Sequence, residues 1–176
     1  MLLILLSLGC HAQQHLTFME IQMGGNFDTF IQSMIGKDLQ VSHKGSHLYG
    51  TDDDEDWCYL SGQFWKFGGV DILVKAPYID GGVTFVNVSS CRADKETYNL
   101  LISQMNRKYG RQITNLNVRY TNDRECIWKT SKGNVIVWRS MFSTDDMKCN
   151  IEIEYQDFPY VKRKEKTKKP FRNSDL

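Results

Sequence analysis

The sequence lacks any internal apolar run approaching the roughly 20 residues that a helix needs to cross a membrane. It also lacks the G-x-S-x-G, H-E-x-x-H and P-loop motifs, which mark nucleophile elbows, zinc proteases and phosphate-binding loops. No two cysteines form a C-x-x-C pair, which argues against a tetrahedral zinc site or a thioredoxin-like redox site. These absences favour a protein without cofactors, and they favour a non-enzymatic role over catalysis.

The start of the chain carries the clearest signal. Residues 2–8 are strongly apolar apart from Ser7, and small residues and then two glutamines follow. This is the pattern of a secretory signal peptide. We expect residues 1–12 to be removed after Ala12, giving a periplasmic or secreted product. An alternative is a lipobox, Ser7-Leu8-Gly9-Cys10, with Cys10 lipidated and the protein anchored to the outer membrane. A buried N-terminal strand is a third interpretation.

The opposite end of the chain is basic. Residues 162–176 carry seven Lys or Arg and two acids, whereas the whole chain has a net charge of only +1. Such a segment cannot bury enough apolar surface to order itself, so we expect a disordered basic tail. It does not alternate aromatic and basic residues as a stacking platform would, so we expect no nucleic-acid partner.

Residues 13–161 remain as one α+β domain, with possible halves at residues 15–91 and 92–158. The composition, 41% hydrophobic and 12% aromatic, is ordinary for a globular protein. An even number of cysteines in an exported chain indicates two disulfides. Our preferred pairs are Cys58–Cys91 and Cys126–Cys149, one in each half, and buried free thiols are the alternative.

Two segments have helical periodicity. Asn26 can cap a helix whose apolar stripe runs from Phe27 to Ile35, and Gly36 is its expected stop. Asp94 can cap a second helix, which Gly110 ends. Residues 15–23 alternate as a strand would.

Strand-like runs follow each helix. The first set is 57–67, 70–76 and 83–88, and the second is 116–120, 126–130, 135–141 and 150–155. The turns at Gly68-Gly69 and Gly133-Asn134 are similar. We therefore expect an antiparallel sheet with two helices packed on one face, and the order of elements suggests a duplicated α-β-β-β unit.

Few clusters of residues suggest a metal site or a catalytic site. Asp52, Asp54 and Asp56 could offer oxygen ligands to Ca²⁺, but the spacing lacks the Gly and Glu of an EF-hand, so we expect a solvated loop and no metal site. His43 and His47 are four residues apart, and Gly45 and Ser46 between them favour a loop. Carboxylates gathered in space, drawn from Asp71, Asp80 and Glu125, would support a small hydrolase.

Aromatic residues gather in the predicted hairpins. Since an antiparallel sheet can leave one face solvated, rings on that face could contact a protein or a sugar. The candidates for such a contact surface are Trp57, Tyr59, Phe64, Trp65, Trp128 and Trp138.

The stretch H-L-T-F-M-E-I-Q-M-G-G at residues 15–25, followed by N-F-D-T-F, resembles the mature start of uncharacterised exported proteins from Bacteroidetes-type bacteria. Those tend to begin H-L-x-F-x-G-I-P; Glu20 and Gln22 stand where the Gly and Pro are usual. The order of elements is also similar to that of β-lactamase-inhibitor-like domains and small envelope lipoproteins. The resemblance implies compartment and architecture, not an activity.

The sequence therefore predicts an exported, non-enzymatic domain that binds a protein or another component of the cell envelope through its sheet. A small hydrolase and a lipid-anchored envelope protein are the alternatives.

Overall fold

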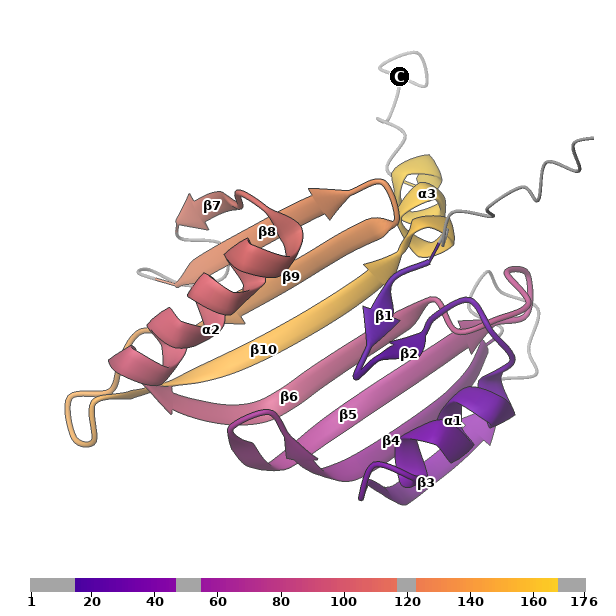
Figure 1. Cartoon of the computed structure of the whole chain (residues 1–176), viewed down its shortest axis with the longest axis horizontal. Helices are drawn as coiled ribbons and strands as arrows, with labels where there is room; N and C mark the ends of the chain where they lie inside the picture. Colours follow the sequence, from indigo (N-terminus) through magenta and orange to yellow (C-terminus); the bar gives the residue numbers. More distant parts are fainter. Residues whose placement is uncertain (1–14, 47–54, 117–122, 168–176) are drawn as a thin grey trace, which may run out of the picture.

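The computed structural model describes residues 15–46, 55–116 and 123–167. Within them the chain forms an eight-stranded antiparallel sheet, a separate two-stranded hairpin and three helices (Figure 1), which confirms the α+β class. The elements are β1 (Thr17–Phe18), β2 (Ile21–Gln22), α1 (Phe27–Ile35), β3 (Gln40–Ser46), β4 (Glu55–Phe64), β5 (Phe67–Pro77), β6 (Phe85–Asp94), α2 (Lys95–Tyr109), β7 (Ile113–Leu116), β8 (Arg124–Thr130), β9 (Gly133–Arg139), β10 (Lys148–Asp157) and α3 (Phe158–Thr167).

Helices α1 and α2 begin and end where their sequences predict. The Asn26 side chain accepts a hydrogen bond from the Thr29 N–H, and Asp94 does the same for Thr97. Each cap satisfies one of the N–H groups left unpaired in a first helical turn. Gly36 and Gly110 close the two helices, as expected.

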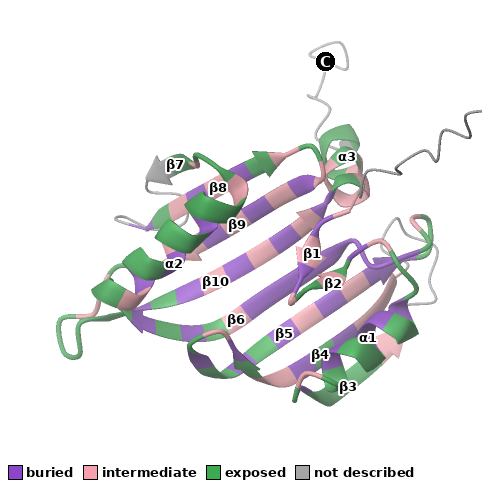
Figure 2. Cartoon of the chain, viewed as in Figure 1, coloured by how far each residue is buried: buried purple, intermediate pink, exposed green. Residues whose placement is uncertain are grey.

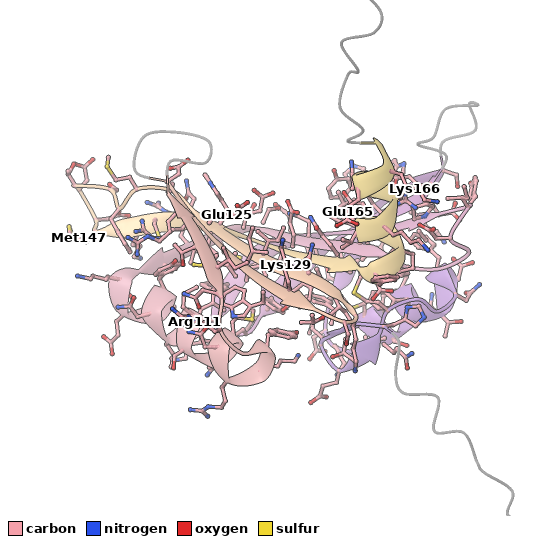
Figure 3. All side chains as sticks on the ribbon, turned by 90° about the horizontal axis from the view of Figure 1, so that it is seen from above. Arg111, Glu125, Lys129, Met147, Glu165 and Lys166 are labelled. Carbon is pink, nitrogen blue, oxygen red and sulfur yellow. The ribbon has the colours of Figure 1, made fainter. Side chains whose placement is uncertain are left out.

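The strands of the large sheet follow the order β3-β4-β5-β6-β10-β9-β8-β7, and every neighbouring pair is antiparallel. Each set of four consecutive strands is a meander, and β6 and β10 join the two meanders at the centre. Helices α1 and α2 lie on one side of this sheet, whereas α3 lies on the other side (Figures 1 and 3).

Alternating burial along the strands places the core beneath α1 and α2. In β10 the buried apolar residues are Cys149, Ile151, Ile153 and Tyr155, with more exposed polar residues between them. The same period of two appears as bands across β5, β9 and β10 (Figure 2). Successive side chains of a strand point to opposite faces, so one face of the sheet is the core and the other forms a separate surface.

Residues 15–23, expected as one strand, instead form the tight β1–β2 hairpin, which lies between α1 and α2 (Figure 1). Met19 and Glu20 both have positive φ, as the central residues of a type I′ turn do. Phe18 is fully buried; its ring stacks on Phe64 and meets Tyr155 edge-on. The hairpin therefore fills the gap that the two helices leave over the core.

The expectation of a disordered tail from residue 162 is wrong for residues 162–167, which continue α3. The helix is held at its start, where Tyr160 packs against Phe85 with ring centroids 5.0 Å apart, and by an ion pair between Arg163 and Asp80. These contacts supply the apolar and ionic anchor that the basic stretch itself lacks. Residues 168–176 lie outside the described residues.

No helix in the described ranges has both the length and the apolar character needed to span a bilayer.

Candidate functional site

The sheet surface opposite α1 and α2 is the broadest candidate site, and we call it the open face. Strand register places one side chain from each of the eight strands in a row across it. In order, this row is His43, Tyr59, Leu73, Asn87, Glu154, Ile136, Ile127 and Ile113. Trp57, Trp138 and Glu152 lie on the same face, one pleat away from the row. Apolar and aromatic side chains therefore flank a polar centre.

The structure divides the six predicted contact aromatics between the two faces. Trp128 is fully buried and its indole N–H donates to Asn106 of α2, so it belongs to the core. Phe64 also belongs to the core, and Trp65 packs against that core, with its ring edge-on to Phe67. Trp57, Tyr59 and Trp138 remain on the open face.

Trp57 and Tyr59 form an edge-to-face pair at the β4 end of the open face. Their ring centroids are 5.7 Å apart, and the Tyr59 residue is 41% exposed. Gly45 of the neighbouring strand gives the indole its space, because a Cβ there would lie 2.5 Å from the Trp57 ring. The pair is thus a fixed aromatic surface rather than two independent side chains.

Two glutamates of β10 occupy the centre of the open face, and the sequence analysis missed them. Asn87 donates to Glu152 at 2.9 Å, and Gln156 donates to Glu154 at 2.7 Å. Side-chain amides thus orient both carboxylates. Their signal in the sequence was the strict alternation of apolar and polar residues along residues 149–156.

Helix α3 bounds the open face at one end. Burial and the negative charges of Glu154 and Glu55 raise the pKa of the Tyr160 phenol to about 12, so Tyr160 stays protonated at neutral pH. A cavity of about 390 Å³ lies between α3 and strands β8–β10, and its lining includes Glu125, Lys129 and Glu165. Figure 3 shows these three labelled side chains on the side of the sheet opposite α2.

The carboxylates proposed for a hydrolase do not come together. Asp71 lies on β5 and Glu125 on β8, four strand spacings apart, or about 19 Å at roughly 4.8 Å per spacing. Asp80 is paired with Arg163 at the end of the sheet. Strand order and register decide which acids become neighbours, and neither can be read from the sequence.

The metal candidates are only partly described. Asp52, Asp54 and His47 lie outside the described residues. Asp56 accepts hydrogen bonds from Ser46 and Tyr78, and His43 is exposed on β3 rather than in the expected loop. Within residues 15–46, 55–116 and 123–167, no three metal-binding side chains gather into a group that could hold an ion.

All four described cysteines are buried free thiols. The expected pairs Cys58–Cys91 and Cys126–Cys149 are each separated by an intervening strand, β5 or β9. Two strand spacings are about 9.6 Å, beyond the roughly 7 Å that a disulfide can bridge between Cα atoms. Burial raises the pKa of Cys91 to about 12 and also raises the pKa of Cys58 and Cys149, so these thiols stay protonated.

A second polar feature joins the start of the described chain to the end of β10. Asp157, fully buried at the end of β10, accepts from the Leu16 N–H at 2.7 Å and pairs with His15 Nδ1 at 2.5 Å. Burial raises the pKa of Asp157, and the hydrogen bonds from His15 and Leu16 act against that rise. Sequence reasoning missed the pair of His15 and Asp157 because 142 positions separate them.

Comparisons with protein families, with curated proteins and with solved structures found no match to this chain. The resemblance of residues 15–30 to exported bacterial proteins therefore stays a prediction. The candidate sites are assigned by their geometry alone.

Proposed function

We propose that this protein is an exported, non-enzymatic binding domain that contacts another protein of the cell envelope through its open face. The observation that carries the proposal is the open face itself, a sheet surface that α1 and α2 do not cover and that presents Trp57, Tyr59 and Trp138. Aromatic residues are enriched at protein interfaces because they bury much area and lose few rotamers.

The chemistry of the open face favours one kind of partner. Glu152 and Glu154 lie at its centre, and in the row Leu73 and Ile136 flank the neighbouring pair Asn87 and Glu154. A carboxylate beside apolar surface suits a Lys or Arg side chain, whose stem packs on the apolar part while its head pairs with the acid. The partner we propose is a protein surface with basic residues set among apolar ones.

Site-specific photocrosslinking in the native host tests this proposal. A photoreactive residue replaces Tyr59 or Leu73 on the open face and, as matched controls, Ile35 of α1 or Leu100 of α2, which are exposed on the helices. We expect one adduct, identified by mass spectrometry, from both open-face positions and from neither control. The double variant Glu152→Gln/Glu154→Gln should lose that adduct.

Equal crosslinking from the helix controls, or an adduct that the double variant keeps, would overturn the proposal. An adduct with the mass of two copies of this chain would show that the open face binds a second copy and not an envelope partner.

Export rests on the first 14 residues and has its own test. The intact mass of the protein recovered from its host should start at Gln13. A diacylated chain starting at Cys10 would make the protein a lipid-anchored one, and an intact residue 1 would contradict export by this signal.

We also propose that the domain is an internal duplication, with α1 and α2 packed as equivalent helices on the sheet. The mirrored strand order supports it: each helix is followed by a four-strand meander, and the two meanders meet at β6 and β10. The repeated unit would then be α-β-β-β-β, one strand longer than the sequence suggests.

A further inference from the structure

A cavity of about 300 Å³ lies on the side of the sheet opposite the open face. It forms where the start of the described chain meets the end of α2 and the β8–β9 turn, and we call it the His15 pocket. Its lining consists of His15, Leu16, Thr17, Lys108, Tyr109, Thr130, Ser131 and Lys132.

The imidazole of His15 is fixed in this pocket from two sides. Asp157 holds Nδ1 at 2.5 Å, and Gly24 packs so closely that a Cβ there would lie 2.2 Å from the same nitrogen. With Nδ1 engaged, Nε2 is the ring nitrogen left for a ligand, and the side chain keeps 29% of its surface exposed. A fixed donor costs less conformational entropy on binding than a mobile one.

The charge around the pocket is positive. Lys108 and Lys132 line it, and none of the described lining residues is acidic. Asp157 is engaged by His15 Nδ1 and the Leu16 N–H and is not part of the lining, so the lining offers the two ammonium groups no counter-charge. The hydroxyls of Thr17 and Ser131 add neutral donors beside them.

We propose that the His15 pocket binds a small phosphate-class oxyanion, with His15 Nε2, Lys108 and Lys132 as its charged donors. Protonated imidazole and ammonium groups form strong, charge-assisted hydrogen bonds with phosphoryl oxygens. The size of the cavity suits a phosphate or a small phosphate monoester, since ligand pockets begin at about 300 Å³. This site is independent of the open face.

Calorimetric titration with inorganic phosphate at constant ionic strength tests the site on the whole protein. We expect saturable binding of inorganic phosphate to the wild-type protein. The double variant Lys108→Gln/Lys132→Gln should bind about tenfold or more weakly, the loss expected for charged hydrogen bonds.

Two further variants separate binding from folding. His15→Asn can keep a donor to Asp157 while it removes Nε2, so it should weaken binding without lowering the melting temperature much. Lys129→Gln is the matched control, because Lys129 belongs to the same β8–β9 hairpin but lines the cavity on the opposite face. If His15→Asn does not fold, the lysine variants carry the test alone.

Glycerol 3-phosphate and vesicles of phosphatidylglycerol distinguish a soluble phosphate from a lipid headgroup. If either probe binds and the double variant Lys108→Gln/Lys132→Gln abolishes that binding, the site is supported. The probe that binds then shows whether the phosphate belongs to a soluble molecule or to a lipid headgroup. No saturable binding of any of the three probes, or binding that the double variant and Lys129→Gln weaken equally, would overturn the proposal.

Discussion

Four buried cysteines lie on four different strands: Cys58 on β4, Cys91 on β6, Cys126 on β8 and Cys149 on β10. An even count in a chain with an export signal favours disulfides, yet each cysteine lies on the core face of its own strand. On a sheet, side chains can bridge only when their strands are neighbours and their register agrees. Neither condition can be read from spacing along the chain.

The thiols give a direct prediction. In the native protein we expect negligible alkylation of these four cysteines by iodoacetamide, because burial both hides them and keeps them protonated. After unfolding without a reductant, all four should react. Peptide mapping by mass spectrometry checks both states, and a cysteine that reacts only after reduction would contradict the free thiols.

Asp157 gives a prediction on pH. Its folded-state pKa is raised, so the folded protein binds more protons than the unfolded chain between the unfolded and folded pKa values. Stability from this group is therefore greatest at acid pH and falls as pH rises through that window. Relative to Asp157→Asn, the wild-type protein should gain stability as pH falls from 7 towards 4.

Urea unfolding of both proteins at several pH values measures that difference, in which the titration of groups that do not interact with Asp157 cancels. A difference that stays constant across the range, or that changes in the opposite direction, would show that Asp157 is not destabilised by its burial.

At the scale of elements, the helices with apolar stripes and clear caps were predictable, whereas strand β3 and helix α3 were not. Strand β3 has no alternating apolar pattern because it is an edge strand with almost every residue exposed. Helix α3 combines a basic sequence with an anchor that lies on β6 and in the β5–β6 loop. Both depend on tertiary partners, which local propensity does not contain.

The two similar glycine turns should respond differently to substitution. Gly133 has a φ of +142°, and a Cβ there would lie 2.1 Å from the Gln156 carbonyl oxygen; at Gly68 a Cβ meets nothing within 4 Å. We expect Gly133→Ala to cost about 2–4 kcal/mol through strain and overlap. Gly68→Ala, the matched control, should change stability by less than about 1 kcal/mol. Chemical denaturation compares them.

Helix α3 should detach when its aromatic anchor is removed. Tyr160→Ala deletes the ring that covers Phe85, a contact worth about 1 kcal/mol beyond its buried area. We expect faster amide hydrogen exchange along α3 with little change in β8–β10. Lys162→Ala, at an exposed position of the same helix, should leave exchange unchanged, and equal effects of the two variants would argue against the anchor.

At the scale of the whole molecule, the β1–β2 hairpin ties the start of the described chain to β10, the last strand in the sequence. Phe18→Ala should lower the free energy of unfolding by about 3–5 kcal/mol, since it empties a fully buried site between Phe64 and Tyr155. Gln22→Ala, exposed in the same hairpin, should cost less than about 0.5 kcal/mol. Thermal or chemical unfolding measures both.

The residues of the open face were predictable only in part. The concentration of aromatics in hairpins did locate Trp57, Tyr59 and Trp138, but it also included Phe64 and Trp128, which face the core. A sequence pattern separates the two faces of a strand without saying which face the helices cover. That choice is made when the whole sheet assembles.

The hairpin also has a consequence for the order of synthesis. Phe18 and His15 are among the first residues of the domain to be made, whereas Tyr155 and Asp157, which enclose and hold them, are among the last. The N-terminus emerges first from a ribosome or a translocation channel. The core therefore cannot form before residue 157 has emerged. Nearly the whole domain must therefore remain unfolded until its final strand, β10, has emerged.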